Sequence, residues 1–174
     1  RVLRTNLEFI VNKEQKSRII ILTSFVQGSG KTFLTINTAI SLAVKGSKVL
    51  IIDGDLRRNA ISKFIHFHKK GLSDYLAGEF NDIEKLFISK IELDADSEYT
   101  DENGKRFLSD NLHVLPVGTI PPNPTELLLN ARFGQLLAEV RTRYDYIFID
   151  CPPVNIMADS QIIGQYADYT IFIV

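Results

Sequence analysis

The sequence predicts an α/β fold, a mainly parallel sheet with helices on both faces. Short apolar runs, typical of strands that are covered on both sides, alternate along the chain with segments of helical periodicity. Polar residues follow three of these runs, where the carboxyl ends of parallel strands would meet. Because open α/β sheets bind ligands at that edge, we expect the functional site there.

The elements follow one another without a long interruption in the first and last thirds of the chain. The expected strands are apolar runs at residues 18–23, 48–53, 111–118, 144–150 and 167–174. The expected helices cover residues 1–12, 31–45, 60–64, 71–78, 81–87, 124–143 and 158–165. Gly46 and Gly78 follow helical segments and are expected to end them in the left-handed conformation. Asn123, Pro124 and Glu126 predict a helix start with proline at its first position and a capping box.

Two segments in the middle of the chain are less regular. Residues 80–93 fit both a helix and a strand, and we favour a helix at 81–87. Residues 94–105 are acidic and polar, with a possible hairpin turn at Asn103–Gly104. The spacing of these acids matches no calcium-binding loop, so we interpret the segment as a surface excursion rather than a metal site.

Composition excludes several classes of protein. The 174 residues carry a formal net charge of −1 and no basic stripe, so we expect no nucleic-acid partner. Cys151 is the single cysteine, which excludes an internal disulfide and fits a reducing compartment. No apolar run approaches the roughly 20 residues of a membrane span. We expect one domain over residues 1–174, cut from a longer protein whose membrane part and C-terminal tail lie outside it.

A glycine-rich segment, Ser24–Thr32, joins the first expected strand to the first long helix. Strand, glycine loop, Lys-Thr and helix is the order of a phosphate-binding loop, which predicts a P-loop nucleotide-binding fold with ATP and Mg²⁺. Lys31 supplies a positive charge for the β- and γ-phosphates and Thr32 a hydroxyl for Mg²⁺. Phe25 stands where the usual pattern has glycine. The expected nucleotide contacts are Gln27, Gly28, Ser29, Gly30, Lys31, Thr32 and Phe33.

Three aspartates, Asp53, Asp55 and Asp150, follow apolar strands. Together they would repel one another unless a cation lies among them, and Mg²⁺ with a triphosphate provides one. Asp53, nearest the strand, is the better candidate for a base, and Asp55 for a metal ligand. A lone aspartate after a strand is more often a turn or cap residue. Arg57 fits a phosphate contact and an ion pair equally well, and Arg58 fits a surface charge better.

These motifs resemble those of the bacterial tyrosine kinases that regulate capsule and exopolysaccharide synthesis. The resemblance covers nearly the whole chain and rests on residues 24–32, on 50–57 with the pattern Asp-x-Asp-x-Arg, and on 147–153. Residues 71–76 and 121–128 also look like family segments. The Asp-x-Asp-x-Arg pattern is the specific one, because phosphate loops occur in many unrelated enzymes.

The resemblance implies an ATP- and Mg²⁺-dependent kinase that phosphorylates a tyrosine cluster in the C-terminal tails of neighbouring subunits. It implies that Lys31 and Thr32 hold phosphate and metal and that Asp53 is the base. Asp55 and Asp150 would serve Mg²⁺, and Arg57 would belong to the catalytic set. None of the visible tyrosines is clustered like that tail.

The resemblance also implies partners and a location. Arg1 and Arg4 match the second half of the family's oligomerisation motif, Glu-x-x-Arg-x-x-Arg, which implies a homo-oligomer of the kind that can close into a ring. Such kinases are fused to a transmembrane domain or activated by a membrane protein, so the domain would work on the cytoplasmic side of the bacterial inner membrane. Gln27 and Cys151 depart from the usual Pro and Thr, without removing a group that the chemistry needs.

Two other functions share these features. One is an ATPase switch of the type that partitions plasmids or positions division sites. Those proteins carry a signature lysine five residues before the main one, and Val26 stands there. The other is a non-enzymatic, nucleotide-sensing scaffold, against which the intact Lys31, Asp53 and Asp150 argue.

Overall fold

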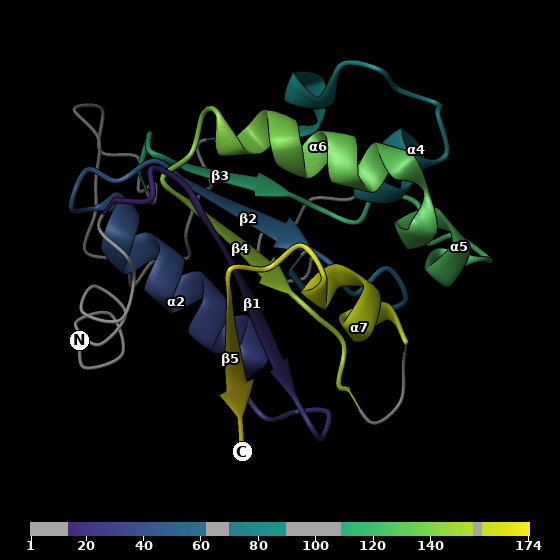
Figure 1. The fold of residues 1–174 in the computed structure, drawn as a ribbon, viewed down its shortest axis with the longest axis horizontal. Coiled ribbons are helices and arrows are strands. Elements are labelled where there is room, and N and C mark those ends of the chain that lie inside the picture. The colour runs from purple at the N-terminus through teal and green to yellow at the C-terminus, as the bar shows by residue number, and fades with distance from the viewer. Residues whose placement is uncertain (1–13, 62–69, 90–108, 155–157) are drawn as a thin grey trace, which may run out of the picture.

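A computed structural model describes residues 14–61, 70–89, 109–154 and 158–174. These residues form one sheet of five parallel strands in the order β3-β2-β4-β1-β5 (Figure 1). The strands are β1 (Arg18–Ser24), β2 (Val49–Asp53), β3 (Leu112–Leu115), β4 (Tyr146–Asp150) and β5 (Tyr169–Ile173). The helices are α2 (Lys31–Ala43), α4 (Leu72–Leu76), the 3₁₀ helix η1 (Ile83–Leu86), α5 (Pro124–Leu129), α6 (Ala131–Arg141) and α7 (Asp159–Gly164). The predicted α/β fold is confirmed.

The two faces of the sheet bury separate apolar clusters. Successive strand residues point to opposite faces, so Ile19 and Ile21 of β1 join one cluster while Ile20 and Leu22 join the other. The first cluster includes apolar residues of α4, α6 and α7, and the second those of α2 (Figure 1). Burial on both sides is why the inner strands are continuous apolar runs rather than alternating ones.

The sheet order places the polar strand ends next to each other. β4 lies between β1 and β2, and Asp53 at the end of β2 pairs in register with Asp150 at the end of β4. Leu22 of β1 pairs with Asp150 from the other side, just before the glycine-rich segment. The loop and two aspartates, far apart in sequence, therefore meet at one edge of the sheet.

The helix predicted at 124–143 is wrong, because the structure has two helices there. Asn130 separates α5 from α6 with an extended backbone, φ −65° and ψ 138°. Its side-chain oxygen accepts a hydrogen bond from the backbone N–H of Arg132 at 3.0 Å and so caps α6. Asparagine is a strong N-cap and a poor interior helix residue, which favours a break here.

The start of α5 is only partly as predicted. Pro124 occupies the first turn, as expected. Asn123 makes no side-chain cap, however, and its Nδ2 instead donates to Oε2 of Glu126 at 2.7 Å, so the predicted capping box is wrong. At the other helix ends, Gly46 and Gly78 have φ of 96° and 83°, which confirms their left-handed conformation.

The ambiguous segment 80–93 has features of both elements that its sequence fits. The expected helix at 81–87 is a short 3₁₀ helix, η1, and it is followed by an antiparallel bridge between Ile88 and Val114. The predictions for residues 1–12 and 94–105 lie outside the described residues, as does most of the helix expected at 60–64. Over the described ranges, no helix is both long enough and apolar enough to cross a membrane.

Candidate active site

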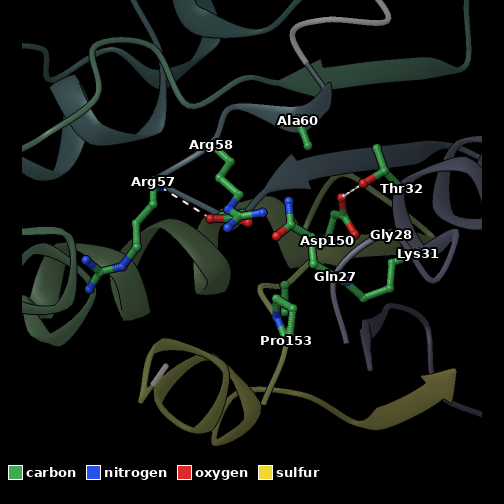
Figure 2. A pocket seen from close by; sticks show the side chains of 11 residues that line it. Gln27, Gly28, Lys31, Thr32, Arg57, Arg58, Ala60, Asp150 and Pro153 are labelled. Carbon is green, nitrogen blue, oxygen red and sulfur yellow. Dashed lines mark hydrogen bonds between the residues drawn. The ribbon is translucent and has the colours of Figure 1, made fainter. Parts of the chain in front are cut away.

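A polar cleft of about 530 Å³ opens at the carboxyl ends of the strands (Figure 2). One wall is the segment between β1 and α2, and the opposite wall is the turn that follows β2. The lining residues are Gln27, Gly28, Lys31, Thr32, Asp55, Arg57, Arg58, Ala60, Asp150, Cys151 and Pro153. Seven of the predicted site residues are among them, whereas Ser29, Gly30, Phe33 and Asp53 are not.

The loop wall depends on two glycines for its backbone conformation. Gly28 and Gly30 have φ of 77° and 86°, a region that other residues adopt at a cost. A side chain at either position would meet nothing within 4 Å, so the requirement for glycine comes from the backbone and not from crowding. In this conformation Gly30 is the N-cap of α2.

The start of α2 is open to an anion. Gly30 offers no side-chain acceptor, and no acidic residue lies in the first turn. The first N–H groups of a helix lack acceptors within it and carry about half a positive charge together. Lys31 adds its ammonium, whose Nζ donates to Oγ of Ser24 at 3.0 Å, while that hydroxyl donates to the carbonyl of Val26 at 2.6 Å.

Thr32 and Asp150 meet at the floor of the cleft. The Thr32 hydroxyl donates to Oδ2 of Asp150 at 2.5 Å. Asp150 is 2 % exposed, and its other oxygen, Oδ1, has no hydrogen-bond partner. Burial raises the pKa of Asp150 to about 6, although the hydrogen bond from Thr32 and the charge of Lys31 act in the opposite direction.

Asp53 lies beneath the cleft rather than on its surface. It is fully buried, and its Oδ2 accepts the backbone N–H of Ile61 at 3.0 Å. Its Oδ1 has no partner. Burial, followed by the neighbouring charge of Asp150, raises the pKa of Asp53 well above its usual value.

Asp55 faces the cleft from the turn after β2. It is 8 % exposed and accepts the backbone N–H of Arg57 at Oδ1, 3.3 Å away. Burial raises its pKa, and the N–H of Arg57 and the charges of Arg58 and Lys31 oppose that rise. Asp55 is therefore the carboxylate best placed to reach a ligand from the wall opposite the loop.

Arg57 forms a network that the sequence did not reveal. Its Nε donates to Oδ2 of Asp159 at 3.1 Å and its Nη2 to the hydroxyl of Thr125 at 3.1 Å. The Thr125 hydroxyl donates in turn to Oδ1 of Asp159 at 2.6 Å. Asp159 is only 1 % exposed. The network supplies a hydrogen bond to each of its two carboxylate oxygens. Thr125 belongs to the segment 121–128 singled out in the sequence, but no spacing in the sequence predicts its contact with Asp159.

The residues present fit a nucleotide with Mg²⁺. The loop and α2 offer donors to phosphate, and Thr32 with Asp150 offers adjacent oxygen ligands. The unpartnered Oδ1 atoms of Asp53 and Asp150 are acceptors that a nearby cation would satisfy. In the part of the chain that the structure describes, no group of three or more His, Cys, Asp or Glu could hold a metal ion. Mg²⁺ in nucleotide sites is commonly held by one or two carboxylates together with phosphate oxygens and water.

Fold and cleft define a P-loop nucleotide-binding domain, and the comparisons with known proteins agree. Residues 17–174 match the family described as the AAA domain. The putative tyrosine-protein kinase CapB of Staphylococcus aureus is 32 % identical over all of this chain and 68 % of that protein. The tyrosine-protein kinase wzc of Salmonella typhimurium is 33 % identical over 99 % of this chain. The chain belongs to the family of bacterial tyrosine-protein kinases.

Solved structures support the same family. The kinase domain of Escherichia coli tyrosine kinase ETK matches all of this chain and 61 % of that chain, with a TM-score of 0.84 and 30 % identity. The septum site-determining protein MinD of Pyrococcus horikoshii, complexed with Mg-ADP, covers 91 % of this chain and 58 % of its own, with a TM-score of 0.67 and 25 % identity. The chain spans 22 % of wzc and 63 % of the tyrosine-protein kinase CpsD of Streptococcus pneumoniae.

Proposed function

We propose that this chain is the catalytic domain of an ATP- and Mg²⁺-dependent protein-tyrosine kinase. It phosphorylates a C-terminal tyrosine cluster of neighbouring subunits and so regulates capsule or exopolysaccharide synthesis and export. The observation that carries the proposal is the meeting of Lys31, Thr32, Asp55 and Asp150 in one cleft, in a chain of this family. The homo-oligomer, the membrane activator or fused membrane domain, and the cytoplasmic face of the inner membrane belong to the same proposal.

Each wall of the cleft has its own task. Backbone N–H groups of the loop, from Gln27 to Phe33, and the Lys31 ammonium bind phosphate oxygens. Thr32, Asp55 and Asp150 hold Mg²⁺ through oxygen ligands. ATP supplies the phosphoryl group when it is bound.

Asp53 is the proposed acceptor of the tyrosine proton. Burial raises the pKa of Asp53 above its usual value, the direction that makes a carboxylate a stronger base. Its Oδ1 has no hydrogen-bond partner that would compete for the proton. Asp55, which faces the cleft, is the natural comparison for any test of this assignment.

A second candidate is an ATPase switch of the MinD type. The TM-score of 0.67 with a MinD complexed with Mg-ADP favours it. Val26 argues against it, since the signature lysine of those switches would stand at this position. An ATPase turns ATP into ADP and inorganic phosphate, whereas a kinase turns it into ADP and phosphotyrosine, so phosphotyrosine separates the two readings.

One assay with two readouts separates these functions. The protein is mixed with Mg-ATP and a full-length parent chain that keeps its C-terminal tail but carries Lys31→Met, and ADP and phosphotyrosine are followed together. Phosphotyrosine in the disabled chain, in step with ADP, is expected for a kinase that acts between subunits. ADP without phosphotyrosine would move the assignment to the ATPase switch, and neither product, with ATP still bound, would move it to a scaffold. Lys85→Met is the control variant, because Lys85 is 77 % exposed and outside the cleft.

A further inference from the structure

Two consecutive arginines line the wall opposite the phosphate loop, and they are held very differently. Arg57 is tied to Asp159 and Thr125 by two hydrogen bonds. The guanidinium of Arg58 makes no hydrogen bond or ion pair with any residue in the described ranges. The Arg58 residue is also exposed.

The turn after β2 sends these two side chains in opposite directions. The backbone N–H groups of Arg58 and Asn59 both donate to the carbonyl of Asp55, at 3.1 Å and 3.3 Å. Figure 2 shows Arg57 extending away from Lys31 and Thr32, and Arg58 directed toward the middle of the cleft. Arg58 lines the cleft together with Asp55, and its charge opposes the rise in the pKa of that carboxyl.

We propose that Arg58 binds the phosphoryl group while it is transferred, and that Arg57 is a positioning residue that fixes the turn carrying Arg58. The inference rests on the proposed function only in placing phosphoryl transfer in this cleft. The transferred group spreads negative charge over its three equatorial oxygens, and a guanidinium offers planar, paired donors to such oxygens. Arg57 could reach them only by leaving the buried carboxylate of Asp159 with Thr125 alone.

Neither arginine gives or takes a proton during the transfer. The bond between the γ-phosphorus and the bridging oxygen of ADP breaks, and a bond to the acceptor oxygen forms. The acceptor proton passes to Asp53. Arg58 stays charged throughout and stabilises the state in which both bonds are partial, so its contribution is to the rate and not to ATP binding.

The direct test uses Mg-ADP with and without aluminium fluoride, which mimics the phosphoryl group in transfer. Dissociation constants are measured for the wild-type protein, Arg58→Ala, Arg58→Lys and the distant control Lys85→Ala. Arg58→Ala is expected to weaken the fluoride-dependent complex at least ~100-fold, in line with arginine contributions in other phosphoryl-transfer enzymes, and to change Mg-ADP binding less than about threefold. Arg58→Lys should fall between, since lysine keeps the charge without the paired donors.

Three results would overturn the inference. The fluoride complex of Arg58→Ala could match that of the wild type. Its affinity for Mg-ADP could fall by the same factor as its affinity for the fluoride complex, which would indicate a ground-state effect. The wild-type protein could form no fluoride complex at all. Failure of the kinase assignment looks different, because an ATPase without phosphotyrosine product would still show the fluoride complex and its dependence on Arg58.

Discussion

The two walls of the cleft are built in opposite ways. The loop wall is one continuous segment, residues 24–32, whose glycines, lysine and threonine act where they stand in the sequence. The opposite wall, the turn after β2, is held by two other segments, since Arg57 contacts residues 68 and 102 positions away. The loop wall can be identified from the spacing of its residues alone, whereas the contacts that hold the opposite wall become visible only in the folded chain.

The largest effect is expected at the carboxylates between the walls. Asp53→Asn should lower phosphoryl transfer by about 10²–10⁴-fold, the usual contribution of a general base, while Mg-ATP still binds. The rate of phosphotyrosine formation and the Mg-ATP dissociation constant are measured on the same preparation. Asp55→Asn is the matched variant on the cleft surface. Undiminished transfer by Asp53→Asn would remove it as the base.

The loop wall should carry nucleotide binding. Lys31→Met is expected to abolish protection by Mg-ATP against heat, because it removes the ammonium at the phosphate site. For the wild type, a ligand at about 100 times its Kd adds roughly 2.7 kcal/mol, a rise in Tm of roughly 5–11 °C at this chain length. Thermal unfolding with and without Mg-ATP measures the Tm shift of the wild type and of Lys31→Met. A Lys31→Met protein that keeps the wild-type shift would show that the loop is not the phosphate site.

The two arginines of the opposite wall should contribute differently to the free energy of unfolding. Arg57→Met leaves the buried Asp159 carboxylate without its cationic partner and is expected to cost about 2–3 kcal/mol, or roughly 4–12 °C in Tm. Arg58→Met, the same change one residue later, should stay within about 0.5 kcal/mol, as for an exposed side chain that makes no hydrogen bond or ion pair in the described ranges. Equal losses of unfolding free energy in the two variants, measured with denaturant, would contradict the expected difference between Arg57, which Asp159 and Thr125 hold, and Arg58, which they do not.

A pH dependence of stability is expected at the floor of the cleft. Burial raises the pKa of folded Asp150 to about 6, above its ordinary 3.8, so ionisation of this group costs stability as the pH rises between these values. Asp150→Asn should therefore be close to the wild type in free energy of unfolding near pH 4 and exceed it by on the order of 3 kcal/mol above pH 6. Urea unfolding without nucleotide, over pH 4–8, tests this. A difference that is constant with pH would contradict the raised pKa.

Much of the fold could be predicted because the strands are buried on both faces and end in polar residues. Val49–Asp53, for example, is apolar up to the aspartate that meets the cleft edge. The break at Asn130 was missed because apolar positions continue on both sides of it, at Leu128 and Phe133. The capping role of the asparagine depends on a local backbone choice that helical periodicity does not show.

The candidate site also has some features that the sequence predicts and others that it does not. The loop and the three aspartates follow from motif spacing and from the rule that parallel strands end at one edge. Motif spacing does not predict the burial of Asp53 beneath the cleft, the contact of Lys31 with Ser24 or the partners of Arg57. Each of these depends on distances between segments that the sequence does not encode locally.

The most direct test of the difference between the walls is a titration of Mg-ATP into Lys31→Met and Arg58→Ala, beside the wild type. We predict that Lys31→Met binds at least ~100-fold more weakly and that Arg58→Ala binds within about threefold of the wild type. Equal weakening in both variants would contradict the account, because both walls would then act on the bound nucleotide in the same way.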